Sequence, residues 1–303
     1  MKSCLMHHST FAKNTHALEE VNSLPLVLDQ PRYRHYPGMK LGYLPDIHFF
    51  ARQLSELALV ILQKKADQNN DWVLTAPAFY QLPAAANLIA RQVQDLLQQR
   101  GISIPLVEPR LSPQQVEIRT REDIKNYNNY SKNNLQQRIA ERQRVQQHID
   151  SNSLLPQFQH KSVIIINDIN VTGTQQQFMQ ARFEQLQARE CTWLYIFTVD
   201  KSLAHRYPDI EYQINSSQWQ SLDQFAELLC DQQTSPTARC LGRLFNETIA
   251  NFRYLAHALD PDTRQRVYEL AQLERRYNGP LFADKMQFLA ASGGHLHISQ
   301  SPG

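Results

Sequence analysis

The sequence predicts an α/β protein in which helices flank a mostly parallel sheet, followed by a helical C-terminal region. Residues 163–166 are four consecutive β-branched residues, a run typical of strands buried on both faces, as in parallel sheets. Between residues 46 and 200, short apolar runs alternate with helical patterns, as expected when strands and helices follow one another. After residue 220 the helical patterns continue, but the strand patterns stop.

The first part of the chain divides into an irregular segment and a long helix. Residues 46–65 carry apolar side chains at helical spacing, which predicts a helix, and we place the start of an α/β domain here. We expect residues 1–45 to be irregular, because proline and glycine interrupt them repeatedly. The interrupting residues are Pro25, Pro31, Pro37, Gly38, Gly42 and Pro45.

The next residues predict a strand–loop–helix–strand unit. The apolar run at residues 72–76 ends directly before Pro77 and predicts a short buried strand. Residues 84–100 are rich in Ala, Leu and Gln and predict a helix that Gly101 closes. Residues 102–107 predict the following strand, so the two strands form a parallel pair with a right-handed crossover.

The second half of the domain, which we end at residue 219, contains the strongest strand signal. Residues 110–132 are polar, and we expect a mobile segment there. The later patterns predict a helix at 133–149, a strand at 161–168, a turn at 169–174, a helix at 175–189, a strand at 192–199 and a short last strand at 212–214.

The C-terminal part predicts a separate helical region at residues 220–291, with breaks at residues 260–262 and 278–280. Residues 274–277 are interpreted as an exposed helix end. Residues 292–303 contain Gly and Ser and predict a flexible tail.

Composition and charge exclude several classes of protein. A formal net charge of +2 gives no reason to expect non-specific nucleic-acid binding. No apolar run approaches the roughly 20 residues that span a bilayer, and residues 1–15 lack the apolar core of a signal peptide. The cysteines form no CxxC pair, so neither a disulfide framework nor a tetrahedral metal site is expected. They are Cys4, Cys191, Cys230 and Cys240. We therefore expect a cytoplasmic protein without a membrane partner.

The residues best suited to chemistry follow the strand at 161–168. Asn167 and Asp168 stand at the expected strand tip, and a turn with Thr172, Gly173 and Thr174 then opens a helix. Amides at a helix start bind phosphate, the threonine hydroxyls add donors, and glycine lets the backbone approach a ligand. A carboxylate at Asp168 accepts hydrogen bonds from ribose hydroxyls, so the segment suits a sugar phosphate. The alternative for so short a motif is a strand–turn–helix that binds nothing.

At these residues the sequence resembles the loop of type I phosphoribosyltransferases that binds 5-phosphoribosyl-1-pyrophosphate (PRPP). Asp168 matches the second of the family's two acidic positions, and Thr172 and Gly173 match its Thr-Gly pair. The sequence departs from the family in having Asn167 at the first acidic position and Gln175 where a second Thr is frequent. The resemblance implies that PRPP contacts Asn167, Asp168, Asn170, Val171, Thr172, Gly173 and Thr174.

Two more segments match the family's order of parts, which the chain follows over residues 46–200. The first loop of the family, which holds pyrophosphate with backbone amides, corresponds to Thr75, Ala76, Pro77 and Ala78, although no Lys or Arg lies within it. The polar segment corresponds to the family's flexible loop, which covers the site during reaction. This implies that Lys132 and Arg138 help pyrophosphate to leave, whereas the alternative is a solvated charged surface.

The resemblance implies an enzyme that transfers the phosphoribosyl group to or from a nitrogenous base. Asp168 would steady the ribose hydroxyls and the developing positive charge. Mg²⁺ would be held mainly by PRPP, with no direct protein ligand expected. Trp219 is a candidate contact of the acceptor base, but no motif names that base.

Two alternative functions stay open. Asn167, the uncharged first loop and the helical region favour a catalytically altered PRPP- or nucleotide-binding module, an effector of the kind found in bacterial stress and anti-phage systems. A scaffold with an empty loop is the other alternative. Residues 220–291 are candidates for an acceptor hood, a homodimer contact or a surface for a protein partner.

Overall fold

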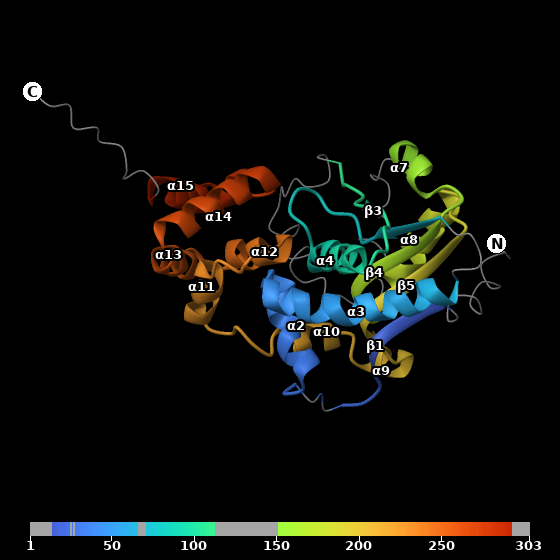
Figure 1. The fold of residues 1–303 in the computed structure, drawn as a ribbon. Helices are drawn as coiled ribbons and strands as arrows, with labels where there is room; N and C mark the ends of the chain where they lie inside the picture. The colour runs from blue at the N-terminus through green and yellow to red at the C-terminus, as the bar shows by residue number, and fades with distance from the viewer. Residues whose placement is uncertain (1–13, 25, 27, 66–70, 113–150, 293–303) are drawn as a thin grey trace, which may run out of the picture.

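Five parallel strands form one sheet in the part of the chain that the computed structural model describes, which is residues 14–24, 26, 28–65, 71–112 and 151–292 (Figure 1). The strand order is β1-β5-β4-β2-β3, and every neighbouring pair is parallel. The strands are β1 (Thr15–Val21), β2 (Trp72–Thr75), β3 (Leu106–Val107), β4 (Ser162–Asn170) and β5 (Glu190–Val199). The predicted α/β fold with a mostly parallel sheet is confirmed.

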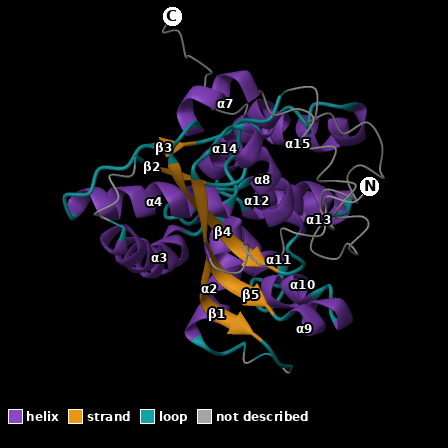
Figure 2. Ribbon diagram, turned by 90° about the vertical axis from the view of Figure 1, so that its right-hand side faces the viewer, coloured by secondary structure: helices purple, strands orange, loops and turns teal. Residues whose placement is uncertain are grey.

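Helices cover both faces of the sheet. On one face, Ile164 and Ile166 of β4 pack with residues of α2 (Pro31–Leu41), α3 (Leu44–Lys64) and α4 (Ala85–Gln99). On the other face, Val163 and Ile165 pack with residues of α7 (Ser151–Phe158) and α8 (Thr174–Gln185). Figure 2 shows α3 and α4 on one side of the strands and α8 on the other. The uninterrupted β-branched run is therefore explained, because alternate residues are buried on opposite faces.

Two short helices, α9 (Lys201–Arg206) and α10 (Ile210–Asn215), follow β5, and Ile210 and Ile214 of α10 join the core under α2. The C-terminal region is then entirely helical within the described residues. It contains α11 (Leu222–Cys230), α12 (Ala238–Asn246), α13 (Ile249–Ala258), α14 (Pro261–Glu274), the 3-10 turn η5 (Pro280–Phe282) and α15 (Ala283–Ser292).

Side-chain caps define the starts of four helices in this region. Ser221, Thr237, Thr248 and Asp260 each accept a hydrogen bond from the amide three residues later, as N-cap residues do. These helices enclose a second apolar core, which also receives Leu41 and Leu82 from the α/β part. The predicted helical C-terminal region is thus present, and Figure 1 shows its orange-to-red helices grouped beside the sheet domain.

The C-terminal region is hydrogen-bonded to the corner between α2 and α3. The amide of Ser235 donates to the carbonyl of Gly42 over 2.9 Å, and the amide of Leu44 donates to the carbonyl of Gln233 over 2.8 Å. The Thr237 hydroxyl donates to the carbonyl of Lys40 over 2.8 Å. Gly42 ends α2 with a φ of 102°, a left-handed value that favours glycine.

The prediction of an irregular segment over residues 1–45 was wrong for its described part. Strand β1 pairs with the outer edge of β5 from Thr15 to Val21, and helix α2 begins at Pro31. Proline fits the first turn of a helix, where its missing amide costs no bond. Helix α2 also contains Pro37, but it buries Tyr36 and Met39 completely, and this burial outweighs the interruption.

Three smaller predictions also need correction. Residues 212–214 belong to helix α10 rather than a strand, because Ile210 and Ile214 share one buried helix face. Strand β3 covers only the last two residues of the predicted 102–107. Strand β4 continues past residue 168 to Asn170.

The predicted helix at 133–149 and most of the polar segment lie outside the described residues. Among the described helices, none is long and apolar enough to span a membrane.

Gly42 and Gly101 make a matched pair for testing the contact at the α2–α3 corner. Both have a positive φ, but a Cβ on Gly42 would lie 1.9 Å from the Ser235 carbonyl oxygen, whereas a Cβ on Gly101 would meet nothing within 4 Å. We expect Gly101→Ala to lower the free energy of unfolding by about 1 kcal/mol, and Gly42→Ala to lower it by at least about 3 kcal/mol. Urea unfolding measures both free energies. Equal losses in the two variants would contradict the close contact between Gly42 and Ser235.

Candidate functional site

The carboxyl edge of the sheet brings two predicted loops together. Strand β2 ends at Thr75, opposite Ile165, whereas β4 continues to Asn170 because β5 still pairs with it there. The loops that follow β2 and β4 therefore both leave the sheet at this edge. In open parallel sheets, ligands bind at this edge.

The turn between β4 and α8 is held in shape by its own side chains. The Asn170 side chain accepts from the Gly173 amide over 2.8 Å and donates to Gln176 over 2.8 Å. The hydroxyls of Thr172 and Thr174 lie 2.8 Å apart. Gly173 has a φ of 73° and forms the N-cap of α8. The side chains of the turn thus hold it in shape, and both side-chain hydrogen bonds of Asn170 lie within it.

This turn has the properties of an anion site. A Cβ on Gly173 would meet only the Gln177 side-chain nitrogen, at 3.9 Å, so space is open beside the backbone. Thr172 is partly exposed, whereas Val171 and Thr174 are buried. The first amides of an α-helix have no carbonyl partner within that helix, and its dipole favours negative charge at this end.

Asn167 and Asp168 do not stand at a strand tip as expected. Pairing with β5 keeps the chain extended as far as Asn170, so the side chains of Asn167 and Asp168 alternate across the sheet. Asn167 is buried, and its side-chain oxygen accepts from the Asp168 amide over 3.0 Å. The nitrogen of the same side chain has no hydrogen-bond partner in the described residues. The two polar groups thus face different layers, and only Asp168 faces α2.

Asp168 forms a largely buried ion pair that the sequence did not reveal. Its carboxylate accepts from Lys40 of α2 and from the Ile169 amide, the latter over 2.8 Å. Lys40 also donates to Glu211 of α10 over 3.3 Å. Burial works to raise the pKa of Asp168, but Lys40, the Ile169 amide and Arg239 together hold it below its ordinary value. Asp168 is therefore an ionised carboxylate with a resident counter-ion.

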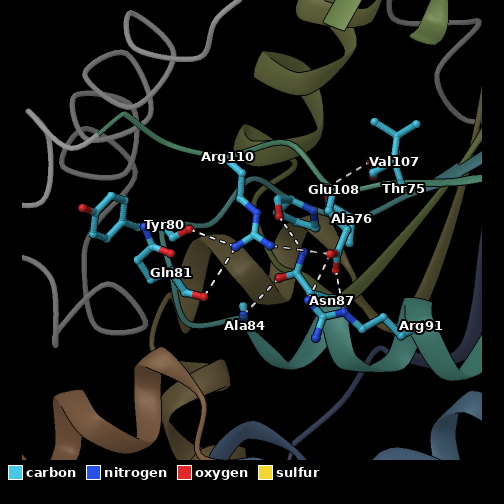
Figure 3. Close-up of polar contacts among 11 residues, drawn as sticks. Thr75, Ala76, Tyr80, Gln81, Ala84, Asn87, Arg91, Val107, Glu108 and Arg110 are labelled. Carbon is cyan, nitrogen blue, oxygen red and sulfur yellow. Dashed lines mark hydrogen bonds and ion pairs between the residues drawn. The ribbon is translucent and has the colours of Figure 1, made fainter. Parts of the chain in front are cut away.

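The first loop is fixed by buried polar contacts, which Figure 3 shows. Thr75 and Ala76 are fully buried, and the Thr75 hydroxyl donates to the carbonyl of Val107 in β3 over 2.7 Å. The Asn87 side chain donates to the Pro77 carbonyl and accepts from the Ala84 amide, each over 3.0 Å. The Thr75 hydroxyl is thus occupied by a contact within the protein. Of the four residues predicted to line the pyrophosphate loop, Pro77 and Ala78 are partly exposed.

Two arginines that sequence reasoning missed lie against this loop. Glu108 binds Arg91 of α4 with both oxygens, over 2.7 and 3.0 Å, and lies 3.8 Å from Arg110 (Figure 3). Arg110 donates to the Tyr80 carbonyl over 3.1 Å, and its guanidinium lies 3.8 Å from the centre of the Phe79 ring. The side chains of Arg91 and Arg110 are 40% and 49% exposed, so both remain accessible to an anion.

A family model described as PRTase ComF-like matches residues 35–289. The chain belongs to this phosphoribosyltransferase-like family. No curated protein matches it. The matched residues run from α2 to α15, so the α/β part and the C-terminal helices both lie within the family's region of similarity.

In this PRTase ComF-like chain the C-terminal helices also fix the first loop. The Glu274 carboxylate is completely buried, accepts from the Leu82 amide over 2.9 Å and forms an ion pair with Arg276. The Ala238 amide donates to the Pro83 carbonyl over 3.2 Å. The interpretation of residues 274–277 as an exposed helix end was wrong, because Glu274 is needed to pair a buried amide of the loop.

The structure does not bring Trp219 together with Asp168. The Trp219 ring packs against Tyr43, and a Cβ on Gly38 would lie 3.3 Å from its indole nitrogen. Gly38 and Lys40 are two positions apart on α2 and so face opposite sides of that helix. Beside Trp219 lies an open hollow of about 470 Å³, lined by Ser217, Gln218, Trp219, Gln220 and Gln224. The other predicted site residues, Lys132 and Arg138, lie outside the described residues.

The described residues do not fit a magnesium ion held by the protein. No three His, Cys, Asp or Glu side chains among them are grouped as metal ligands. The carboxylates of Asp168 and Glu211 both bind the Lys40 ammonium.

Helix α3 carries a second buried carboxylate, Asp46, which lies against Gly38 of α2 and whose ionisation is measurable. Asp46 lies 2.7 Å from the Nδ1 atom of His35. Burial raises the pKa of Asp46 to about 6, although His35 opposes the shift. Since the folded state holds the proton more tightly, the stability that protonated Asp46 contributes is present below about pH 4 and is lost as the pH rises through about 6.

We therefore expect the stability of the wild type relative to Asp46→Asn to fall by on the order of 2 kcal/mol from pH 4 to pH 7. Urea unfolding of both proteins across this range measures the difference. A pH-independent difference would show that Asp46 ionises as it does in water.

Proposed function

We propose that this protein binds PRPP at the carboxyl edge of its sheet and transfers the phosphoribosyl group to a nitrogenous base. The observation that carries the proposal is the prebuilt β4–α8 turn, in which Gly173 leaves open space beside two threonine hydroxyls and a helix start. Membership of a phosphoribosyltransferase-like family supports the same ligand. The match does not extend to a particular base, which stays undefined.

The 5-phosphate of PRPP is assigned to the turn. Thr172 is partly exposed and its hydroxyl faces that of Thr174, so a phosphate oxygen is able to replace one partner of this pair. The Thr174 amide donates to the Thr172 hydroxyl over 3.4 Å, so a phosphate oxygen that replaces this hydroxyl would gain the amide as a further donor. Asn170 contributes by holding the turn, since its side chain is occupied by Gly173 and Gln176.

The diphosphate is assigned to the first loop and its two arginines. Guanidinium groups bind phosphate oxygens through paired hydrogen bonds, and Arg110 is preorganised by the Phe79 ring and the Tyr80 carbonyl. Glu108 orients both arginines and neutralises only one of their two charges. Mg²⁺, carried by the oxygens of PRPP, would complete the charge balance.

In this proposal Asp168 lies on the sugar's side of the site. As the bond from the ribose carbon to pyrophosphate breaks, its electron pair leaves with pyrophosphate, and the arginines stabilise the new charge. The positive charge left on the sugar is stabilised by the nearby carboxylates, Asp168 and Glu211, and the base nitrogen then bonds to the same carbon. A homodimer and a partner bound through residues 220–291 stay predictions.

Calorimetry with PRPP and Mg²⁺, followed by a pyrophosphate-release assay over several bases, tests the proposal. We expect one binding site per chain and pyrophosphate release with at least one base. Asp168→Asn is expected to lower the release rate by at least about 100-fold, because it removes charge that stabilises the transition state. Binding without release from any base would instead select a binding module, and no binding would leave a scaffold.

The two subsites are separable with a shorter ligand. Arg110→Ala is expected to weaken PRPP binding by about tenfold or more, because a charged hydrogen bond is lost, and to leave ribose 5-phosphate binding unchanged. Thr172→Ala is expected to weaken both. Arg100→Ala is the matched control, since Arg100 is similarly exposed and ion-paired to Glu56 but lies at the far end of α4. Equal losses for both ligands in Arg110→Ala would contradict the assignment.

A further inference from the structure

A largely buried ammonium lies on the sugar's side of the proposed site. Lys40 reaches from α2 to carboxylates on two other elements, Asp168 on β4 and Glu211 on α10. The three side chains are 11%, 15% and 7% exposed, respectively. Burying three charged groups is costly, and apolar residues of similar size would hold α2 on the sheet at least as well. A cluster of this kind is typical of a functional site.

A second feature indicates a ligand. The Tyr36 side chain is completely buried, and its hydroxyl has no hydrogen-bond partner among the described residues. After burial, Asp168 and Glu211 are the main groups that raise the pKa of Tyr36. Lys40 also lies 5.6 Å from the centre of the Tyr36 ring. A buried hydroxyl without a partner is expensive, and a polar ligand would satisfy it.

The ammonium stands where a divalent cation would otherwise stand. Carboxylate oxygens are among the donors that Mg²⁺ and Mn²⁺ prefer, and Asp168 and Glu211 would supply them. Lys40 fills the space between the two carboxylates, so a metal would have to displace it. An ammonium has three donors and the carboxylates use two, which leaves one for a ligand oxygen.

We propose that Lys40 is the resident cation of the sugar subsite, replacing a metal held by the protein and donating a hydrogen bond to a ribose hydroxyl. The sugar ligand in this inference rests on the proposed function. The identity of the cation rests on the ion pairs of Lys40 alone. Magnesium carried by the diphosphate of PRPP is a separate ion. Ribose 5-phosphate, which has no diphosphate, therefore binds without metal.

The test uses the full chain with two probes, ribose 5-phosphate and Mn²⁺ alone. For the wild type, calorimetry is expected to give the same dissociation constant in EDTA and in Mg²⁺, and paramagnetic resonance is expected to detect no bound Mn²⁺. Lys40→Met keeps the length of the side chain and removes its charge. In EDTA, Lys40→Met is expected to bind ribose 5-phosphate at least about tenfold more weakly than the wild type does. Adding Mg²⁺ is expected to restore this affinity, and the variant is expected to bind Mn²⁺ in the absence of the sugar phosphate.

Lys65→Met is the matched control. Lys65 also forms an ion pair with a partly buried carboxylate, Glu190, and lies 5.6 Å from the centre of an aromatic ring, that of Trp72. Glu190 and Trp72 begin their strands, so this pair lies at the opposite edge of the sheet. Lys65→Met is expected to behave as the wild type with both probes. In Lys40→Met/Asp168→Asn, Mn²⁺ binding should be lost again.

The outcomes separate the two proposals. Metal-dependent binding of ribose 5-phosphate to the wild type, or the absence of Mn²⁺ binding in folded Lys40→Met, would overturn the role of Lys40. If Lys40→Met does not fold, the wild-type comparison in EDTA and Mg²⁺ decides the question without it. If the wild type binds no ribose 5-phosphate in either buffer, the proposed function fails, and the Mn²⁺ titrations of wild type and Lys40→Met still test the cation.

Discussion

The parallel pairing of β4 with β5 determines the geometry of the carboxyl edge. Because β5 keeps β4 extended to Asn170, the side chains of Asn167 and Asp168 alternate between the two faces of the sheet. The same pairing moves the turn to residues 171–173, immediately before the start of α8. The acidic side chain is therefore directed to α2, while the hydroxyls of the turn remain at the edge of the sheet. A phosphate at the turn and a sugar beside Asp168 are both compatible with this arrangement.

Buried charge links the α/β part to its neighbouring helices. Asp168 is matched by Lys40, and Glu274 is matched by Arg276 and by the Leu82 amide. Removing one partner of such a pair leaves an uncompensated charge, which is far more destabilising than replacing the whole pair. The C-terminal helices are accordingly part of the site's support, since Glu274 fixes the first loop from outside the sheet. A family match that runs through both parts agrees with this dependence.

The candidate site was predictable where its residues are neighbours in the chain. Thr172, Gly173 and Thr174 form a local turn whose chemistry follows from residue type alone. Lys40 and Asp168 are separated by most of the α/β domain, and no local pattern connects them. Arg91 and Arg110 were missed for the same reason, because one lies within a helix and the other follows β3. The two arginines come to lie beside the first loop only because β3 pairs with β2 after the chain has passed through α4.

By itself the sequence determined the parallel sheet, the helices around it and the helical C-terminal region, because hydrophobic periodicity is a local property of the chain. It failed for β1, which gains its structure from the edge of β5, and for α2, which forms despite two prolines because it buries Tyr36 and Met39. Tertiary structure alone decided which charges meet: Lys40 with Asp168 and Glu211, Glu274 with Arg276, and two arginines with Glu108. Ion pairs of this kind depend on distances between elements, and those distances are fixed only when the helices pack on the sheet.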